Sequence, residues 1–441
     1  MRVIVLVDGE HYPPVTRWGI DLARERGLEP VAALMLGGTE KLRPGEDPDL
    51  GVPLRRAGGS ARDALATALD ELDVLGVLDL SDEPVVGYRE RLELASVALA
   101  RGLAYLGPDV RLDPPVDGPM LEVPTVAVFG VGKRTGKTAI AGEVARIAAR
   151  ADLDPVVVAM GRGGPPQPQV APAGSVGIER LLELVRGGEH AASDYLEHAV
   201  TTGVTTVGAR RVGGGLGGRP YATNVREAAE VAAGLGGLVV MDGSGAALPS
   251  VPWDAGVLVV PAGLPPEYLG GYLGPLRLLL SDLVVVTMGR SPAGLENLPI
   301  LRSHVERLRG DARLIVTDFE PMPLGDVRGR DVFFTTTASR ATAEQQSKAL
   351  ESVHGCRVVG WSARLADRAG LAQDLDGAEA YEVLLTELKA AAVDVACDRA
   401  LAKGAEVLFV DNRAVVVEGE ADLSSALMET IGLAGERRTR R

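Results

Sequence analysis

A glycine-rich segment that leads into Lys137 and Thr138 is the part of this sequence best suited to chemistry. It follows a short apolar run at 126–129 and precedes an alanine-rich stretch at 139–150 whose composition is typical of a helix. At such a strand–loop–helix junction, backbone N–H groups and the helix N-terminus face phosphate oxygens, the lysine reaches the β- and γ-phosphates, and the hydroxyl binds Mg²⁺. The junction therefore predicts binding of ATP or GTP. The predicted nucleotide-binding residues are Gly132, Lys133, Arg134, Thr135, Gly136, Lys137 and Thr138.

Two positions in this loop depart from familiar patterns. Val131 stands where the usual pattern has its first glycine, although Gly130 and Gly132 flank it. Partition-type ATPases have an extra lysine five residues before the loop lysine. Here Lys133 lies only four residues before Lys137. A regulatory ATPase of the partition type therefore stays an alternative, but the position of Lys133 does not favour it.

A second apolar run, at 237–241, ends in Asp242 and is followed by a Gly-Ser-Gly turn. Open α/β folds bind ligands at the carboxyl ends of their strands, and a carboxylate there can hold Mg²⁺ directly or through water. The alternative is an aspartate that begins an ordinary turn. The predicted metal ligands are Thr138 and Asp242, and the predicted cofactors are ATP and Mg²⁺.

Arginines stand beside several glycine turns. Arg162 and Arg290 follow directly on predicted strands, which puts them at the same sheet edge as the phosphate-binding loop. Guanidinium groups bind phosphate and carboxylate through two parallel hydrogen bonds, so these arginines indicate a polyanionic small substrate. For each of them the alternative is a solvated surface position. The arginines predicted to bind substrate are Arg162, Arg211, Arg219 and Arg290.

The first predicted strand ends in a polar cluster that includes Asp8, Glu10 and His11. His11 could donate to a phosphate or relay a proton, and the alternative is a loop with an exposed histidine. We predict that Glu10 and His11 bind substrate, and that the catalytic residues are Lys137, Arg162, Asp242 and His11. The other histidines are interpreted as solvent-facing positions on or near helices, without a role: His190, His198, His304 and His354.

Length and composition limit the class of protein. A chain of 441 residues with 55 glycines predicts two or three α/β domains. A net charge of −14 argues against general binding to nucleic acid or to anionic membranes. Cys356 and Cys397 lie far apart without metal-type spacing, which favours reduced thiols and the cytosol. No stretch approaches the roughly 20 apolar residues that a membrane span needs, so we expect a soluble, cytoplasmic protein.

Alternating strand and helix patterns predict an α/β fold throughout. Residues 1–112 are predicted to form a Rossmann-like parallel-sheet domain, 113–122 a linker, 123–330 a P-loop NTPase domain, and 331–441 a small α/β C-terminal extension. That extension either continues the nucleotide-binding sheet or forms a third lobe. The predicted strands are 3–7, 31–36, 74–79, 125–129, 155–160, 237–241, 257–260, 283–287, 314–317, 332–335, 357–359, 407–411 and 414–417. The predicted helices are 15–26, 61–71, 88–102, 139–150, 178–185, 224–233, 268–280, 298–308, 338–352 and 378–398, with a functional loop at 162–175 and a frayed end at 436–441.

Four segments, 7–15, 130–138, 160–165 and 242–246, resemble the cyclic 2,3-diphosphoglycerate synthetase family, and the resemblance extends over about residues 1 to 400. It implies a cytosolic, dimeric enzyme that uses ATP and Mg²⁺ to close 2,3-bisphosphoglycerate into its cyclic form through an intramolecular phosphoanhydride, with release of ADP and phosphate. The preference for adenine rests on this resemblance. The P-loop domain is also similar to the class that holds dethiobiotin synthetase. Three alternatives stay open: a kinase or ligase for another phosphorylated small acid such as 2-phosphoglycerate, a partition-type ATPase, and a scaffold with a vestigial loop.

Overall fold

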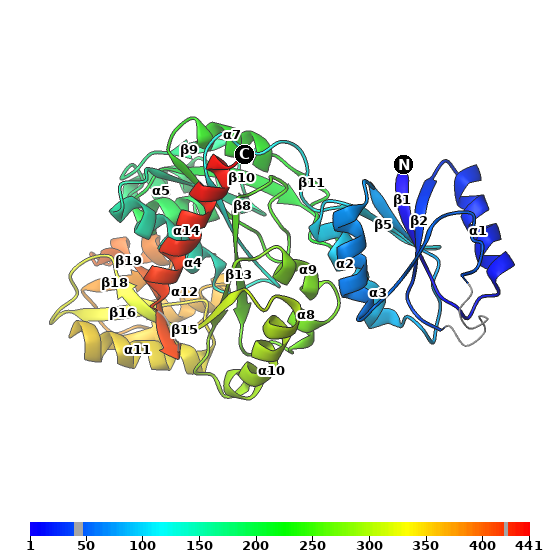
Figure 1. The fold of residues 1–441 in the computed structure, drawn as a ribbon. Helices are drawn as coiled ribbons and strands as arrows, with labels where there is room; N and C mark the ends of the chain where they lie inside the picture. The colour runs from blue at the N-terminus through cyan, green and yellow to red at the C-terminus, as the bar shows by residue number, and fades with distance from the viewer. Residues whose placement is uncertain (39–46, 419–421) are drawn as a thin grey trace.

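The computed structural model describes residues 1–38, 47–418 and 422–441, and it contains two sheets flanked by helices (Figure 1). The first sheet has the strand order β3-β2-β1-β4-β5-β6 and is parallel except for the pair β5–β6. Its strands are β1 (Arg2–Val7), β2 (Glu29–Met35), β3 (Leu54–Arg56), β4 (Gly76–Asp79), β5 (Ala104–Leu106) and β6 (Arg111–Leu112). Its helices are α1 (Pro13–Glu25), α2 (Ala61–Glu71) and α3 (Tyr88–Ala100).

Side-chain alternation along β1 explains how this first sheet is covered. Val3, Val5 and Val7 pack with α1 on one face, whereas Ile4 and Leu6 pack with α2 and α3 on the other. Successive side chains of a strand point to opposite faces, so an unbroken apolar run requires cover on both sides. The N-terminal domain is therefore a three-layer α/β unit.

The second sheet has the order β11-β10-β8-β12-β7-β13-β14-β15-β19-β18-β16-β17, with β9 paired to β10. Neighbours from β10 to β15 are parallel, and β15 pairs with β19 antiparallel. The strands are β7 (Thr125–Gly130), β8 (Pro155–Gly161), β9 (Gln169–Ala171), β10 (Thr206–Val212), β11 (Ala222–Thr223), β12 (Leu238–Asp242), β13 (Ala255–Pro261), β14 (Leu283–Thr287), β15 (Arg313–Pro323), β16 (Asp331–Thr335), β17 (Arg357–Ser362), β18 (Val383–Thr386) and β19 (Glu406–Glu418). The helices are α4 (Lys137–Arg150), α5 (Ile178–Arg186), α6 (Asp194–Thr202), α7 (Val225–Ala233), α8 (Glu267–Gly270), α9 (Gly274–Leu279), α10 (Pro292–Leu308), α11 (Arg340–His354), α12 (Arg368–Asp376), the π-helix η2 (Ala392–Cys397), α13 (Asp398–Ala402) and α14 (Leu423–Thr439).

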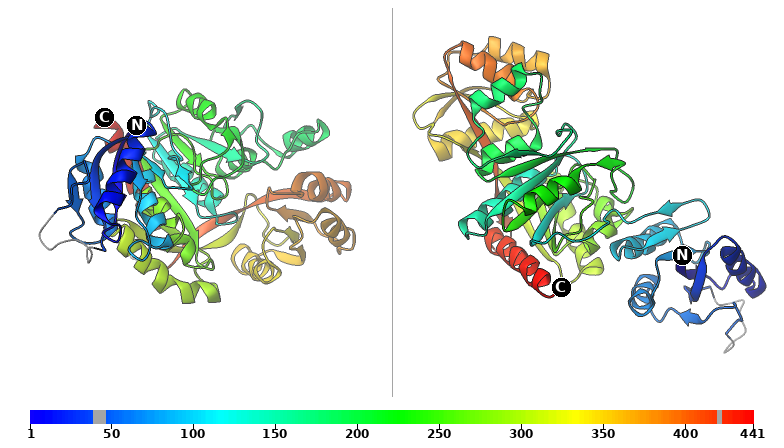
Figure 2. Two further views of the ribbon diagram at one scale, coloured as in Figure 1. Left: turned by 90° about the vertical axis from the view of Figure 1, so that its right-hand side faces the viewer. Right: turned by 90° about the horizontal axis from the view of Figure 1, so that it is seen from above.

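Strand β19 connects the C-terminal part of the chain to the P-loop sheet. Its first residues pair with β18, and its residues from Val410 onward pair with β15. The strands β16, β17 and β18 complete a lobe with α11 and α12, and after β19 the chain returns to pack α14 against α4. The C-terminal segment thus continues the nucleotide-binding sheet and also builds a lobe. Figure 2 shows this lobe and the N-terminal domain at opposite ends of the P-loop domain.

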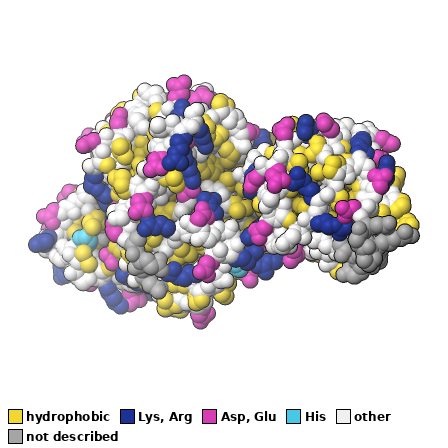
Figure 3. Space-filling view, in the orientation of Figure 1, with side chains coloured by type: hydrophobic (Ala, Val, Ile, Leu, Met, Phe, Trp, Pro, Cys, Tyr) yellow, Lys and Arg dark blue, Asp and Glu magenta, His cyan; other side chains and the backbone are white. Residues whose placement is uncertain are grey.

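The N-terminal domain joins the P-loop domain through α3 and α9. Leu273 and Leu276 lie in the apolar cluster that α2 and α3 form. At the rim, Arg307 donates to Glu93 at 2.8 Å and its carbonyl accepts from Arg62 at 2.7 Å. Figure 3 shows the resulting waist between the two bodies, with acidic and basic side chains interspersed on this face.

The predicted α/β fold class is confirmed, but three predicted elements are wrong. Residues 378–398 were predicted as one helix, yet they contain strand β18, which is buried between β16 and β19, and the π-helix η2. Residues 268–280 form two short helices, since the chain breaks at Tyr272, whose φ is +48°. Residues 436–441 are not frayed, because α14 runs to Thr439. Among the described helices none has both the length and the apolar character needed to cross a bilayer.

The C-terminal residues are held by buried carboxylates. Arg437 donates to both oxygens of Asp282, at 2.8 and 2.9 Å, and to the Asp254 carbonyl at 2.8 Å. We expect Arg437→Met to lower the free energy of unfolding by about 1.5–3 kcal/mol, because charge-assisted hydrogen bonds to a largely buried carboxylate are lost. Urea denaturation measures this loss. Arg440→Met is the matched control: Arg440 is 77% exposed, pairs with Glu436, and should change stability by less than about 0.5 kcal/mol. Equal stability of the two variants would contradict the expectation.

Candidate active site

The phosphate-binding loop lies between the end of β7 and the start of α4. Gly136 caps α4 with a φ of +86°, and a Cβ at this position would lie 2.3 Å from the Phe319 ring, so only glycine fits. Lys137 is 7% exposed, and its ammonium donates to the Gly132 carbonyl at 2.7 Å and to Thr135 Oγ1 at 3.1 Å. Burial lowers the pKa of Lys137 to about 8, even though nearby carboxylates act in the opposite direction. The loop therefore presents a desolvated cation at the N-terminus of α4.

The strand order brings four of the predicted residues to one part of the sheet edge. Strands β10, β8, β12 and β7 are consecutive parallel neighbours, so their carboxyl ends lie side by side. Asp242 ends β12, Arg162 follows β8, and Arg211 lies near the end of β10. Lys137, after β7, interacts electrostatically with all three. Two guanidinium groups, an ammonium and a carboxylate thus lie near one another at the sheet edge.

The turn after Asp242 packs against the guanidinium groups of Arg162 and Arg211. Gly245 has a φ of +61°, and a Cβ on it would lie 2.9 Å from an Arg162 nitrogen and 3.1 Å from an Arg211 nitrogen. Arg211 also donates to the Ser244 carbonyl at 2.8 Å and to the Gly213 carbonyl at 2.7 Å. These carbonyls orient the Arg211 guanidinium, and its pKa is lowered by burial and by the neighbouring Arg162. Two adjacent cations cost electrostatic free energy, which a bound polyanion would offset.

Helix α6, which the sequence did not predict, adds Asp194, Glu197 and His198 to this edge. Glu197 and His198 follow Asp194 by three and four positions, so both share a helix face with Asp194. Burial raises the pKa of Glu197 to about 7, and burial together with Asp242 raises the pKa of Asp194. His198 was predicted to face solvent, but it is 0% exposed, and its Nε2 lies 3.0 Å from Asp242 Oδ2. Burial works against the charged imidazole, yet the hydrogen bond to Asp242 and the nearby carboxylates raise the pKa of His198.

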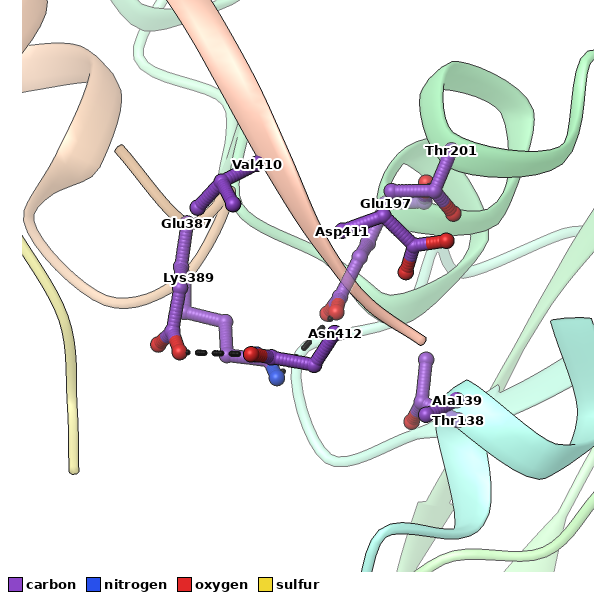
Figure 4. A pocket seen from close by; sticks show the side chains of 9 residues that line it. All are labelled: Thr138, Ala139, Glu197, Thr201, Glu387, Lys389, Val410, Asp411 and Asn412. Carbon is purple, nitrogen blue, oxygen red and sulfur yellow. Dashed lines mark hydrogen bonds and ion pairs between the residues drawn. The ribbon is translucent and has the colours of Figure 1, made fainter. Parts of the chain in front are cut away.

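The C-terminal lobe faces α6 and the start of α4 across a small hollow (Figure 4). Lys389 Nζ lies 3.2 Å from Glu197 Oε1, and Asn412 Nδ2 donates to Glu387 Oε1 at 2.9 Å. The negative charge of Glu197 raises the pKa of Lys389. The residues that line the hollow are Thr138, Ala139, Glu197, Thr201, Glu387, Lys389, Val410, Asp411 and Asn412. Thr138 of the phosphate-binding loop is thus close to charged residues of the C-terminal lobe, which sequence patterns gave no means to find.

Other predicted residues make contacts of their own. Arg290 follows β14, which lies four strand spacings, or about 19 Å, from β8, the strand that precedes Arg162. It is exposed and pairs with Glu320 at 3.6 Å. Arg219 donates to Asp117 and to the Pro114 carbonyl, in the segment that precedes β7.

Glu10 and His11 lie in the N-terminal domain, after β1. The His11 Nδ1 atom lies 2.9 Å from Asp8 Oδ1, and the same oxygen accepts from the backbone N–H groups of Glu10 and His11. Lys133 and Arg134 are exposed on the phosphate-binding loop, where Arg134 has a φ of +58°. The remaining histidines are varied: His190 is exposed, while His304 and His354 are partly buried, the latter near the Pro321 carbonyl.

The donor set at Asp242 fits a magnesium ion. Asp242 is 3% exposed, and its Oδ1 has no hydrogen-bond partner among the described residues. A buried carboxylate oxygen without a donor is costly unless a cation or water satisfies it. In the part of the chain that the structure describes, no group of three or more His, Cys, Asp or Glu side chains could hold a metal. Proteins bind Mg²⁺ through one or two side chains plus phosphate oxygens and water, and Asp242 would be one such ligand.

Comparison with known proteins identifies related proteins over the full length of the chain. Its residues 2–113, 125–318 and 323–413 match, in turn, the N-terminal, P-loop and C-terminal domains of cyclic 2,3-diphosphoglycerate synthetase. The cyclic 2,3-diphosphoglycerate synthetase of Rubrobacter xylanophilus is 47% identical, over 100% of this chain and 99% of that protein. The cyclic 2,3-diphosphoglycerate synthetase of Methanothermus fervidus is 38% identical, over 98% and 97%.

Among solved structures, the "apo" form of LpxK from Aquifex aeolicus in complex with ATP is 15% identical, with a TM-score of 0.42, over 72% of this chain and 90% of that chain. That likeness is too distant to bear on function. The full-length relatives and the three matched domains decide the assignment. The chain is an ATP-binding enzyme, and it belongs to the cyclic 2,3-diphosphoglycerate synthetase family.

Proposed function

We propose that this enzyme closes 2,3-bisphosphoglycerate into cyclic 2,3-diphosphoglycerate with ATP and Mg²⁺, releasing ADP and phosphate. The observation that carries the proposal is the cluster of Lys137, Arg162 and Arg211 at one sheet edge of a chain whose net charge is −14. Joining two phosphates of one molecule requires an activated phosphoryl group and suppression of the repulsion between dianions. Clustered cations at the nucleotide site supply that suppression.

The nucleotide half of the site uses the loop and β12. Lys137 and the N-terminus of α4 would bind the β- and γ-phosphates. Thr138 and Asp242 would hold Mg²⁺, which when bound neutralises charge between those phosphates. Lys137 and Asp242 are both buried, which strengthens their interactions with a bound phosphate and a cation.

The substrate half uses Arg162 and Arg211. In the first step one substrate phosphate attacks the γ-phosphorus of ATP, a new P–O–P bond forms, and the bond to ADP breaks. In the second step the other substrate phosphate attacks the phosphorus of the diphosphate that is ester-linked to the carbon chain. The ring anhydride then forms and inorganic phosphate leaves. No protein nucleophile is required, so the work of the side chains is positioning and charge neutralisation.

The roles of four further predicted substrate residues stay predictions: Glu10, His11, Arg219 and Arg290. A homodimer also stays a prediction, which light scattering of the purified protein tests. The acidic net charge supports a small-molecule substrate in preference to nucleic acid.

Phosphorus NMR of the complete reaction tests the proposed function. With ATP, Mg²⁺ and 2,3-bisphosphoglycerate we expect a new pyrophosphate-type resonance together with ADP and phosphate. Under the same conditions 2-phosphoglycerate should give no cyclic product. ADP formation with 2-phosphoglycerate alone would instead support a kinase for another phosphorylated acid.

Arg162→Ala should lower kcat/KM for 2,3-bisphosphoglycerate by about 10- to 150-fold, which corresponds to about 1.5–3 kcal/mol for one charge-assisted contact. Steady-state kinetics at saturating ATP measures the change. Arg180→Ala is the matched control, because Arg180 is an exposed arginine of α5 that pairs with Glu183. An unchanged kcat/KM in Arg162→Ala would return Arg162 to a solvated surface role.

A further inference from the structure

We propose that His198 is a positioning residue that fixes the Asp242 carboxylate with one oxygen turned toward Mg²⁺. The inference rests on the proposed function, since it takes Asp242 as a metal ligand. It adds a residue and a helix, α6, to a site that the loop and the strand ends otherwise define. His198 itself touches neither nucleotide nor substrate in this account.

The two oxygens of Asp242 differ in their surroundings. Oδ2 lies 3.0 Å from His198 Nε2, whereas Oδ1 is buried and has no hydrogen-bond partner among the described residues. A carboxylate turns about its Cβ–Cγ bond between two equivalent orientations, and a donor on one oxygen removes that freedom. His198 therefore ties one oxygen and leaves the other available to a cation. Outer partners of this kind orient metal ligands, and their loss typically weakens metal binding by about 10- to 100-fold.

The ring of His198 is itself fixed. It is 0% exposed on α6, which packs against α4, β8 and β10. The His198 carbonyl accepts from Thr202 Oγ1 at 2.6 Å, and Thr206 Oγ1 of β10 donates to the Tyr195 carbonyl at 2.9 Å. Nδ1 of His198 is buried without a partner in the described part of the chain, so the tautomer with the proton on Nε2 leaves no donor unsatisfied. In that tautomer His198 donates to Asp242.

Manganese binding to the ADP complex tests this role without turnover. Electron paramagnetic resonance measures the Kd of Mn²⁺, used in place of Mg²⁺, for the full-length enzyme saturated with ADP. His198→Leu, which removes the donor, should raise that Kd by about tenfold or more. His198→Gln, which can present an N–H near the position of Nε2, should restore it to within about threefold of wild type. ADP affinity in excess chelator should be unchanged in both variants.

Thr206→Val is the matched control, because it removes a buried hydrogen bond that holds α6 but does not contact Asp242. It should lower the melting temperature and leave the Mn²⁺ Kd unchanged. If His198→Leu does not fold, His198→Gln is compared with His198→Asn, whose shorter side chain does not reach Asp242. The proposal would be overturned if His198→Leu, or His198→Asn in its place, had the same Mn²⁺ Kd as the wild type. It would also be overturned if Thr206→Val weakened Mn²⁺ binding by the same factor. Asp242→Asn distinguishes a failure of the metal assignment from a failure of the role of His198. If this variant binds Mn²⁺ as the wild type does, Asp242 is not a metal ligand and the metal assignment fails as well.

Discussion

Lys137→Ala is expected to reduce ATP turnover by at least about 100-fold while the protein stays folded. Lys137 is 7% exposed and lies at the N-terminus of α4, where we propose that the β- and γ-phosphates bind. Among the described residues its side chain donates to Gly132 and Thr135 of the same loop, so alanine removes no hydrogen bond that joins two helices or strands there. A preorganised cation in a desolvated site stabilises the transition state far more than it would in water.

ADP formation measured with 2,3-bisphosphoglycerate present, together with circular dichroism, tests this expectation. Lys348→Ala is the control for loss of a lysine, because Lys348 is 72% exposed on α11 and pairs only locally with Glu344. The control should keep wild-type turnover. A well-folded Lys137→Ala protein with wild-type turnover would remove the nucleotide site from the loop.

Asp242→Asn has the second large expected effect, a fall in kcat of about 100-fold or more. The substitution keeps the shape of a 3% exposed side chain but removes its charge. We expect weaker Mg²⁺ binding, since a neutral amide is a poorer ligand than a carboxylate. The Mg²⁺ concentration for half-maximal rate should therefore rise, and excess Mg²⁺ should recover part of the lost activity.

Asp254→Asn is the matched control for Asp242→Asn. Asp254 is also buried, at 2% exposed, but it lies at the start of β13, where it accepts from the Thr125 N–H and pairs with Arg441. Its substitution should lower the melting temperature and leave the Mg²⁺ dependence of the rate unchanged. If Asp242→Asn lost stability alone, with normal Mg²⁺ dependence, Asp242 would be a structural carboxylate.

Residues at the sheet edge could be predicted because the sequence patterns that mark a strand end are local. Each of the positions Lys137, Arg162 and Asp242 follows an apolar run whose end is visible in the sequence. Parallel strands bring their carboxyl ends to one edge, so a strand end alone places a residue there. The order of strands along the edge is not local, however. For this reason Arg290 had the same signal as Arg162 but lies on the far side of β7.

The sequence did not identify His198 and Lys389 as site residues, because each reaches the site through contacts between distant segments of the chain. His198 meets Asp242 across 44 positions of the chain, and nothing in the short stretch around it marks a buried histidine. Lys389 reaches Glu197 from the C-terminal lobe, after a segment whose alanine, leucine and glutamate content favours a helix. Burial between β16 and β19 instead makes residues 383–386 a strand, which shows tertiary context overriding local propensity.

We propose that the triphosphate of a nucleotide and a polyanionic substrate share one cationic edge of the sheet. Paramagnetic relaxation tests it most directly, with Mn²⁺ and ADP bound to the enzyme and the phosphorus resonances of 2,3-bisphosphoglycerate observed. If the two anions share this edge, the phosphates of the bound substrate show strong relaxation enhancement, which Arg162→Ala diminishes. Substrate that binds the wild-type complex without enhanced relaxation would show that the two anions bind at separate places and would contradict the proposed shared site.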